Sequence, residues 1–173
     1  NFDLGIIRNH YTGRTFIQES SAIRDLSVKL KHNPNLSSLR NKNIALIDDS
    51  IVRGTTSVKI VEMLKNCGVK KIHMRIASPP VMFPCFYGID TPNKEELLAS
   101  KYSLEEIRNF IGVDTLEFIS LDGVYKALGH KNGRNSKKPA YTDHYFSGDY
   151  PVELVDQKSG VFSSQLSLLI ESK

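Results

Sequence analysis

The chain has 173 residues, of which 40% are hydrophobic and 24% are charged, a composition that permits a packed core and argues against disorder. No apolar run reaches the roughly 18 residues of a membrane-spanning helix, so no membrane partner is expected. The net charge is +4, but the basic residues are scattered and are not interleaved with stacking aromatic residues, so no nucleic-acid partner is expected either.

The start of the chain and its cysteines suggest where the protein resides. The chain begins with Asn1 rather than methionine, which suggests a fragment of a longer polypeptide, and residues 1–14 lack the pattern of a signal peptide. Cys67 and Cys85 are not closely spaced, which argues against a disulfide framework and against a self-contained zinc site. These features favour the reducing cytoplasm.

The predicted elements begin with a helix over residues 23–30, which ends before a break at residues 33–35. A continuous apolar run at residues 43–47 then predicts a parallel strand buried on both faces. Apolar residues recur every three or four positions over residues 56–66, which predicts a helix, and residues 72–76 alternate as a strand does. A strand, a helix and a strand in this order form a βαβ unit, so we expect an α/β fold with a parallel sheet.

Further short elements are expected after residue 90. Thr91 would cap a short helix, and Ser103 with Glu106 would form a capping box for the next helix. A strand is predicted over residues 116–119.

The last part of the chain is expected to mix helices and loops. Asp122 would cap a helix that ends near Leu128. Residues 129–139 are polar, basic and rich in glycine and asparagine, which predicts a surface loop, and residues 166–170 are expected to form a terminal helix.

The run IDDSIVRGTTS at residues 47–57 indicates the chemistry most clearly. Asp48 and Asp49 follow the predicted strand, at the edge of the sheet where ligands bind in open α/β folds. Gly54 permits a tight loop, and three hydroxyl residues then begin a helix whose amino terminus would attract phosphate. The pattern suits a sugar phosphate, because carboxylates can hold ribose hydroxyls and Mg²⁺ while the loop holds the phosphate.

A simpler interpretation of the same run is structural. The two aspartates would cap a turn, and the hydroxyl residues would cap the helix. The run is neither a Walker loop nor a Gly-x-Gly-x-x-Gly turn. The residue types alone leave both interpretations open.

Three segments of the chain resemble the glutamine-dependent amidophosphoribosyltransferases. Residues 47–57 resemble their signature motif for phosphoribosyl diphosphate (PRPP). This form of the motif is more specific than the one shared by other type I phosphoribosyltransferases. Residues 8–17 resemble the family's flexible loop, and residues 78–90 resemble the segment after its next strand. The three matches follow the family order, so the resemblance favours ligand binding over the capping interpretation.

The resemblance implies a fold and an activity. The fold would be the type I phosphoribosyltransferase fold, a parallel sheet flanked by helices, with its amino-terminal part missing. This partial domain would occupy residues 1–150, and a C-terminal helical and loop extension would occupy residues 151–173. Family members combine PRPP with glutamine-derived ammonia and release pyrophosphate and 5-phosphoribosylamine, the first committed step of purine synthesis. The chain would therefore be part of a pentosyltransferase.

The same resemblance assigns the site. PRPP and inhibitory purine nucleotides would contact ten residues in a row: Asp48, Asp49, Ser50, Ile51, Val52, Arg53, Gly54, Thr55, Thr56 and Ser57. The two aspartates would also hold Mg²⁺. The flexible loop that closes over the substrate would include Arg8, Tyr11, Arg14 and Thr15. No catalytic residue is expected in this chain, because ammonia is already a nucleophile and the protein has only to position the reactants and stabilise charge. A homo-oligomer is expected.

The chain also departs from the family pattern. The glutaminase domain with its nucleophilic cysteine is absent, so ammonia would come from a missing domain and the fragment alone would be inactive. Some members hold an iron–sulfur cluster through four cysteines; Cys85 matches one of them, but Thr142 and Tyr145 stand at two others, so no cluster is expected. Both cysteines are then expected to be small buried apolar residues. His144 is expected to make a structural hydrogen bond.

Two other functions stay open. The chain could belong to another type I phosphoribosyltransferase, acting on orotate or a purine base, although residues 84–90 would then be unexplained. It could also be a non-catalytic, nucleotide-binding regulator of the same fold. The intact loop sequence at residues 8–17 and the lack of an appended DNA-binding helix argue against the regulator.

Overall fold

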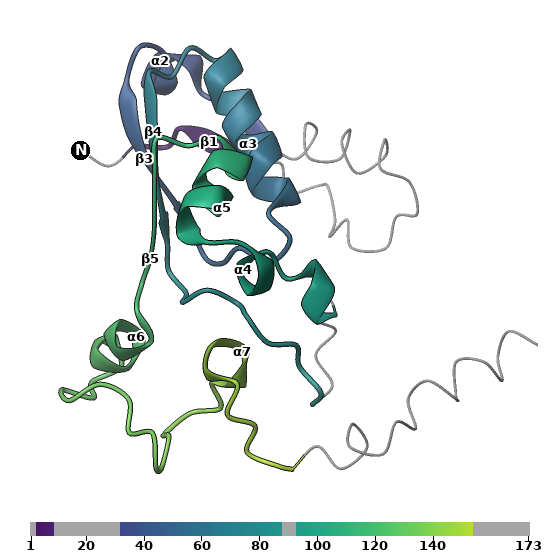
Figure 1. Cartoon of the computed structure of the whole chain (residues 1–173). Helices are drawn as coiled ribbons and strands as arrows, with labels where there is room; N and C mark the ends of the chain where they lie inside the picture. Colours follow the sequence, from purple (N-terminus) through teal and green to yellow (C-terminus); the bar gives the residue numbers. More distant parts are fainter. Residues whose placement is uncertain (1–2, 9–31, 88–92, 154–173) are drawn as a thin grey trace, which may run out of the picture.

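The computed structural model describes residues 3–8, 32–87 and 93–153 (Figure 1). Its main sheet has three parallel strands in the order β3 (Asn43–Asp48), β4 (Lys71–Ile76) and β5 (Thr115–Phe118). Both strand pairs are parallel and in continuous register. The three predicted strands and the parallel sheet are confirmed.

Two helices cover one face of this sheet. The helices α3 (Thr55–Asn66) and α5 (Leu104–Ile111) pack against each other on the same side of the strands (Figure 1). The connections β3–α3–β4 and β4–α5–β5 both advance in the same direction across the sheet. Because such crossovers are right-handed, they place their helices on the same face. The core lies between the sheet and these helices, and it includes the buried residues Val61, Leu64, Ile72, Met74, Ile76, Ile107, Ile111 and Leu116.

In the described parts of the chain, nothing covers the opposite face of the sheet at β3, and this corrects the expectation that β3 is buried on both faces. The residues of β3 alternate between exposed and half-buried, and Ile47 is 73% exposed, so this strand is not buried on both faces. Among the described residues β3 pairs with β4 alone. A groove of about 870 Å³ runs along this strand and is lined by residues 3–6 and 42–47, among others. None of residues 48–57 lines the groove.

A second, antiparallel sheet lies near the start of the chain. It pairs β1 (Ile6–Arg8) with β2 (His32–Pro34) and is followed by the short helix α2 (Leu36–Leu39). The predicted break at residues 33–35 is therefore partly a strand, which Pro34 can join because β2 is an edge strand of a two-stranded sheet. The helix predicted over residues 23–30 lies outside the described residues.

The described residues of the connection between β4 and β5 form three helical segments. They are η1 (Lys94–Glu96), α4 (Leu98–Lys101) and α5. The predicted capping box is confirmed, since the Ser103 N–H donates to Oε2 of Glu106 and the Ser103 hydroxyl accepts from the Glu106 N–H. Thr91 lies outside the described residues.

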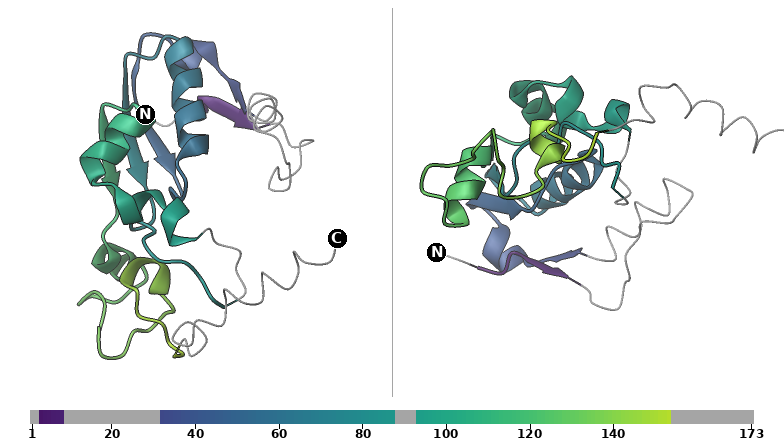
Figure 2. Two further views of the ribbon diagram at one scale, coloured as in Figure 1. Left: turned by 45° about the vertical axis from the view of Figure 1, so that its right-hand side comes forward. Right: turned by 90° about the horizontal axis from the view of Figure 1, so that it is seen from below.

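Two further helices, α6 (Leu121–Ala127) and α7 (His144–Ser147), lie beyond the carboxyl ends of the strands (Figure 2). The cap of α6 is Ser120, whose hydroxyl accepts from the Gly123 N–H at 3.0 Å, so the prediction that Asp122 caps this helix is wrong. Residues 129–139 contain no helix or strand, which confirms the predicted loop. The terminal helix predicted at residues 166–170 is not among the described residues. No described helix has the length and apolar character needed to cross a membrane.

Candidate phosphate-binding site

Two adjacent carboxylates mark the carboxyl end of β3. Asp48 is half-buried, Asp49 is exposed, and the Asp49 N–H donates to Oδ1 of Asp48 at 3.0 Å. The Ser50 hydroxyl donates to Oδ1 of Asp49 at 2.9 Å. Burial raises the pKa of Asp48, and the negative charge of Asp49 adds to this increase against the effect of the backbone hydrogen bond. A cation or a pair of hydroxyl donors at this position would relieve the repulsion between the two carboxylates.

The loop from residue 49 to residue 54 is held in place by contacts with the hydrophobic core and with Leu98. The side chain of Ile51 is 2% exposed and belongs to the hydrophobic core. The carbonyl of Val52 accepts a 2.9 Å hydrogen bond from the Leu98 N–H. The backbone of the loop is therefore fixed without a ligand.

Gly54 is required at the end of this loop for two reasons. Its φ of 74° lies in the left-handed region, which other residues rarely adopt. In addition, a Cβ atom there would lie 2.8 Å from Cδ2 of Leu98 and 3.1 Å from Cε1 of Phe110. The glycine thus lets the backbone turn directly into α3.

The amino terminus of α3 is available to an anion. Gly54 is the N-cap and provides no side-chain cap, and the first bond of the following turn runs from the Val58 N–H to the Gly54 carbonyl. The first N–H groups of a helix lack partners within it and carry the positive end of its dipole. Thr55 and Thr56 are exposed beside these groups, whereas Ser57 is buried. The interpretation in which the hydroxyl residues cap the helix is therefore wrong.

The structure divides the ten predicted site residues into three groups. The exposed residues are Asp49, Arg53, Thr55 and Thr56, the half-buried residues are Asp48, Ser50 and Val52, and the buried residues are Ile51, Gly54 and Ser57. The buried residues support the loop, so they could contact a ligand only through their backbone. The carboxylates, Arg53 and the two threonines are the groups that a ligand can reach.

The sequence patterns did not identify three residues that lie next to the loop. Leu98 and Phe110 pack against the loop, and Glu96 forms an ion pair with Arg53 at 2.7 Å. These residues lie some 40 or more positions along the chain, and no local pattern marks them. The predicted flexible-loop residue Arg8 is the last residue of β1, while Tyr11, Arg14 and Thr15 lie outside the described residues.

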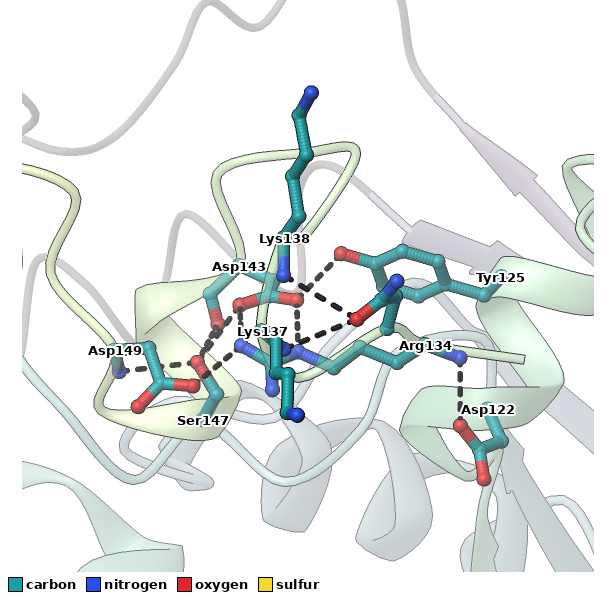
Figure 3. A network of polar contacts seen from close by, with 9 residues as sticks. Asp122, Tyr125, Arg134, Lys137, Lys138, Asp143, Ser147 and Asp149 are labelled. Atoms are coloured by element: carbon teal, nitrogen blue, oxygen red, sulfur yellow. Dashed lines mark hydrogen bonds and ion pairs between the residues drawn. The ribbon is translucent and has the colours of Figure 1, made fainter. Parts of the chain in front are cut away.

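A second polar cluster surrounds Asp143 (Figure 3). Arg134 binds this carboxylate through two nitrogen atoms, with Nε 2.6 Å from Oδ2 and Nη2 3.0 Å from Oδ1. The hydroxyls of Tyr125 and Ser147 each donate to it at 2.7 Å, and Arg134 also pairs with Asp149. These bonds occupy both carboxylate oxygens, so the cluster is structural rather than a vacant binding site.

The environment of His144 differs from the expectation. The residue is 2% exposed, and neither ring nitrogen has a hydrogen-bond partner among the described residues, so the predicted hydrogen bond is absent. Its ring instead stacks against Tyr145 and Tyr150, with ring centroids 4.1 and 5.2 Å apart, and meets Tyr87 edge-on at 5.1 Å. Burial lowers the pKa of His144, and the charge of Asp143 opposes this effect.

The two cysteines are half-buried rather than buried, and no disulfide joins them. The sulfur of Cys85 accepts a hydrogen bond from the Tyr87 N–H at 3.3 Å. Within the described parts of the chain, no group of three or more histidine, cysteine or acidic side chains could hold a metal ion. A metal at Asp48 and Asp49 would therefore need oxygen atoms from a ligand or from water.

Comparisons with known proteins agree on one family, although the sequence matches no protein-family profile. An amidophosphoribosyltransferase of Rhizobium etli is 50% identical over 169 residues, which are 97% of this chain and 34% of that protein. The Bacillus subtilis amidophosphoribosyltransferase is 46% identical over 153 residues, 88% of this chain and 32% of the relative. A chloroplastic amidophosphoribosyltransferase of Arabidopsis thaliana is 51% identical over 157 residues, 91% of this chain and 27% of the relative.

Solved structures give the same result. Glutamine PRPP amidotransferase from B. subtilis, complexed with ADP and GMP, superposes with a TM-score of 0.73 at 47% identity and covers 88% of this chain and 33% of that one. A structure described as the allosteric regulatory enzyme of purine biosynthesis also has a TM-score of 0.73, at 45% identity, and covers 89% of this chain and 33% of that one. The chain spans about a third of the length of these relatives. It is therefore related over most of its length to the amidophosphoribosyltransferases, and its fold is that of a type I phosphoribosyltransferase.

Proposed function

We propose that the polypeptide containing this chain is a glutamine-dependent amidophosphoribosyltransferase. It would convert PRPP and glutamine-derived ammonia to 5-phosphoribosylamine and pyrophosphate, at the start of purine synthesis. The observation that carries the proposal is the position of Asp48 and Asp49 beside the open amino terminus of α3. The three relatives described above are named as amidophosphoribosyltransferases, which supports this function over the other phosphoribosyltransferases and over a regulator.

Each part of a phosphorylated ribose has a counterpart in this site. The carboxylates can accept hydrogen bonds from the ribose 2- and 3-hydroxyls. The first-turn N–H groups of α3, with the hydroxyls of Thr55 and Thr56, can hold the 5-phosphate. Because the loop is fixed by Ile51 and by the hydrogen bond between Val52 and Leu98, its backbone would bind the ribose without reorganising.

The residues present are compatible with Mg²⁺ at the two aspartates. Mg²⁺ is commonly held by one or two carboxylates together with substrate phosphates and water, and two adjacent carboxylates provide that set. The ion would supply charge neutralisation for the departing pyrophosphate. Asp48 and Asp49 would orient the ribose against the loop. Catalysis by this chain would then consist of positioning and charge stabilisation.

Other parts of the proposal concern the whole protein. Purine nucleotides are expected to compete for the same loop, and a B. subtilis relative was solved with ADP and GMP. Glutamine would be hydrolysed by a domain outside this chain. A homo-oligomer and a cytoplasmic location also belong to the proposal, the latter because the two cysteines form no disulfide. We expect no iron–sulfur cluster, because Thr142 and Tyr145 provide no thiolate.

Titration calorimetry of the full-length polypeptide with PRPP, with and without Mg²⁺, tests the site. We expect Mg²⁺-dependent binding that weakens by about 10- to 100-fold in Asp48→Asn and in Asp49→Asn, since each change removes a charged hydrogen-bond acceptor. Glu62→Gln is the matched control, because it removes one negative charge from an exposed position on α3. Undiminished binding by both aspartate variants would contradict the assignment.

A further inference from the structure

The ion pair between Arg53 and Glu96 joins the phosphate-binding loop to the helical segment after β4. Nε of Arg53 lies 2.7 Å from Oε2 of Glu96, and the two side chains are 53% and 48% exposed. Arg53 directly precedes Gly54, the N-cap of α3. Its guanidinium group is therefore carried by the residue next to the proposed phosphate position.

Glu96 is exposed, but the backbone that carries it is firmly held. It is the last residue of η1, and its N–H donates to the Asn93 carbonyl at 2.8 Å. The Ser100 hydroxyl donates to the carbonyls of Lys94 and Leu97 at 2.6 and 2.8 Å. The next residue, Leu97, is completely buried. The carboxylate thus has a defined position from which it can hold Arg53.

The loop does not depend on this ion pair for its own conformation. The backbone bond between Val52 and Leu98, the burial of Ile51 and the packing of Gly54 against Leu98 already fix residues 51–54. The ion pair therefore determines where the side chain of Arg53 lies and has little effect on the backbone. A side chain that is held by one exposed carboxylate can be displaced at low cost, because such pairs contribute about 1 kcal/mol or less.

We propose that Glu96 is a positioning residue that holds Arg53 beside the loop in the ligand-free protein, and that Arg53 leaves Glu96 for the phosphate oxygens of the bound ligand. The inference rests on the proposed function and adds a residue to its site. A guanidinium group binds a phosphate through paired, charge-assisted hydrogen bonds, which are stronger than its contact with one exposed carboxylate. Glu96 then competes with the ligand for Arg53 and lowers the affinity of the site.

This competition predicts that loss of the Arg53–Glu96 ion pair makes the site bind its ligand more tightly, whereas loss of a contact usually weakens binding. In the full-length polypeptide, Glu96→Gln should lower the dissociation constant for ribose 5-phosphate by about two- to fivefold, because the competing pair is removed. Arg53→Gln should weaken binding. Adding Glu96→Gln to Arg53→Gln should change nothing further, since no guanidinium group is left to release.

Glu95→Gln is the matched control, because Glu95 is exposed, adjacent, and forms no ion pair with another described residue. It should leave the affinity close to that of the parent. A general effect of lost negative charge would instead tighten binding equally in both glutamate variants and in the Arg53→Gln background, and this result would overturn the proposal.

The remaining outcomes separate this inference from the proposed function. If the parent binds ribose 5-phosphate and Glu96→Gln binds it equally or more weakly, then Glu96 supports the loop or does nothing, and the inference fails alone. If the parent binds neither ribose 5-phosphate nor PRPP, the proposed function fails and the inference fails with it. Urea unfolding of each variant shows whether the fold is retained.

Discussion

The hydroxyl of Tyr125 donates a 2.7 Å hydrogen bond to Oδ2 of Asp143, and this contact ties α6 to the start of α7. Arg134, from the loop between these helices, binds both oxygens of the same carboxylate. Three segments that are separate in the sequence therefore meet at one buried negative charge. The buried residues Tyr125 and His144 lie outside the core between the sheet and its helices, so this charge links a separate part of the fold.

The Asp143 cluster should make a large contribution to stability. Asp143→Ala would leave the Arg134 side chain, which is 10% exposed, without its main partner, so we expect the free energy of unfolding to fall by about 3–5 kcal/mol. Glu105→Ala is the control, because its ion pair with Arg108 is longer, at 3.4 Å, and its side chain is 76% exposed. The control substitution should lower the free energy of unfolding by about 1 kcal/mol or less. Urea unfolding measures both, and equal losses would contradict the prediction.

The same carboxylate should make stability depend on pH at the acidic end. Burial alone would raise the pKa of Asp143, but hydrogen bonds from Arg134, Tyr125 and Ser147 lower it to about 2. Because the pKa in the folded state lies below the unfolded value, this stabilisation is present above about pH 4 and is lost as the pH falls toward 2. The ionised Asp143 carboxylate contributes about 2 kcal/mol to the free energy of unfolding above this pH range. The difference in unfolding free energy between the parent and Asp143→Asn should shrink over this range, and a constant difference would exclude the linkage.

Gly54→Ala should destabilise the protein and impair ligand binding together. The substitution forces alanine into a left-handed conformation and brings its Cβ within 2.8 Å of Leu98, so we expect a loss of about 1–3 kcal/mol. Gly129→Ala is the control, since Gly129 also has a positive φ but a Cβ there would meet nothing within 4 Å. The control should show only the smaller backbone cost. Thermal unfolding and PRPP titration compare the two variants, and similar results for both would rule out the clash.

Asp49→Ala should abolish synthesis of 5-phosphoribosylamine with either glutamine or ammonia as the nitrogen source. The exposed carboxylate serves the ribose and the metal rather than the core, so the unfolding curve should stay within about 0.5 kcal/mol of the parent. The assay uses the full-length enzyme and each nitrogen donor in turn, with Glu62→Ala as the control. A fully active Asp49→Ala enzyme would contradict the site.

Ile47 should promote self-association when the 173-residue chain is produced alone. It is 73% exposed on β3, which in the described part of the chain pairs on one side only and borders a groove. Exposed apolar edge strands tend to pair with other chains, so Ile47→Lys should shift size-exclusion profiles toward the monomer. Leu128→Lys, at a position that is 55% exposed and does not line the groove, should have little effect. An equal shift in both variants would assign the change to net charge.

The sequence by itself determined the elements whose interactions are local. The strand β3, the helix α3 and the strand β4 follow from apolar spacing within short windows, and the capping box of α5 follows from two residues three positions apart. The candidate site was also found in this way, because its carboxylates, glycine and hydroxyl residues are consecutive in the chain.

Only the tertiary structure decided the contacts that join distant positions. The partner of Arg53 is 43 residues away, and β1 and β2 pair across residues 9–31. Ser120 caps α6, whereas Asp122 accepts a hydrogen bond from the Arg134 N–H. Local patterns record backbone propensity and which face of an element is apolar. They do not show which polar groups come into contact in the folded protein, since packing across the whole fold selects those partners.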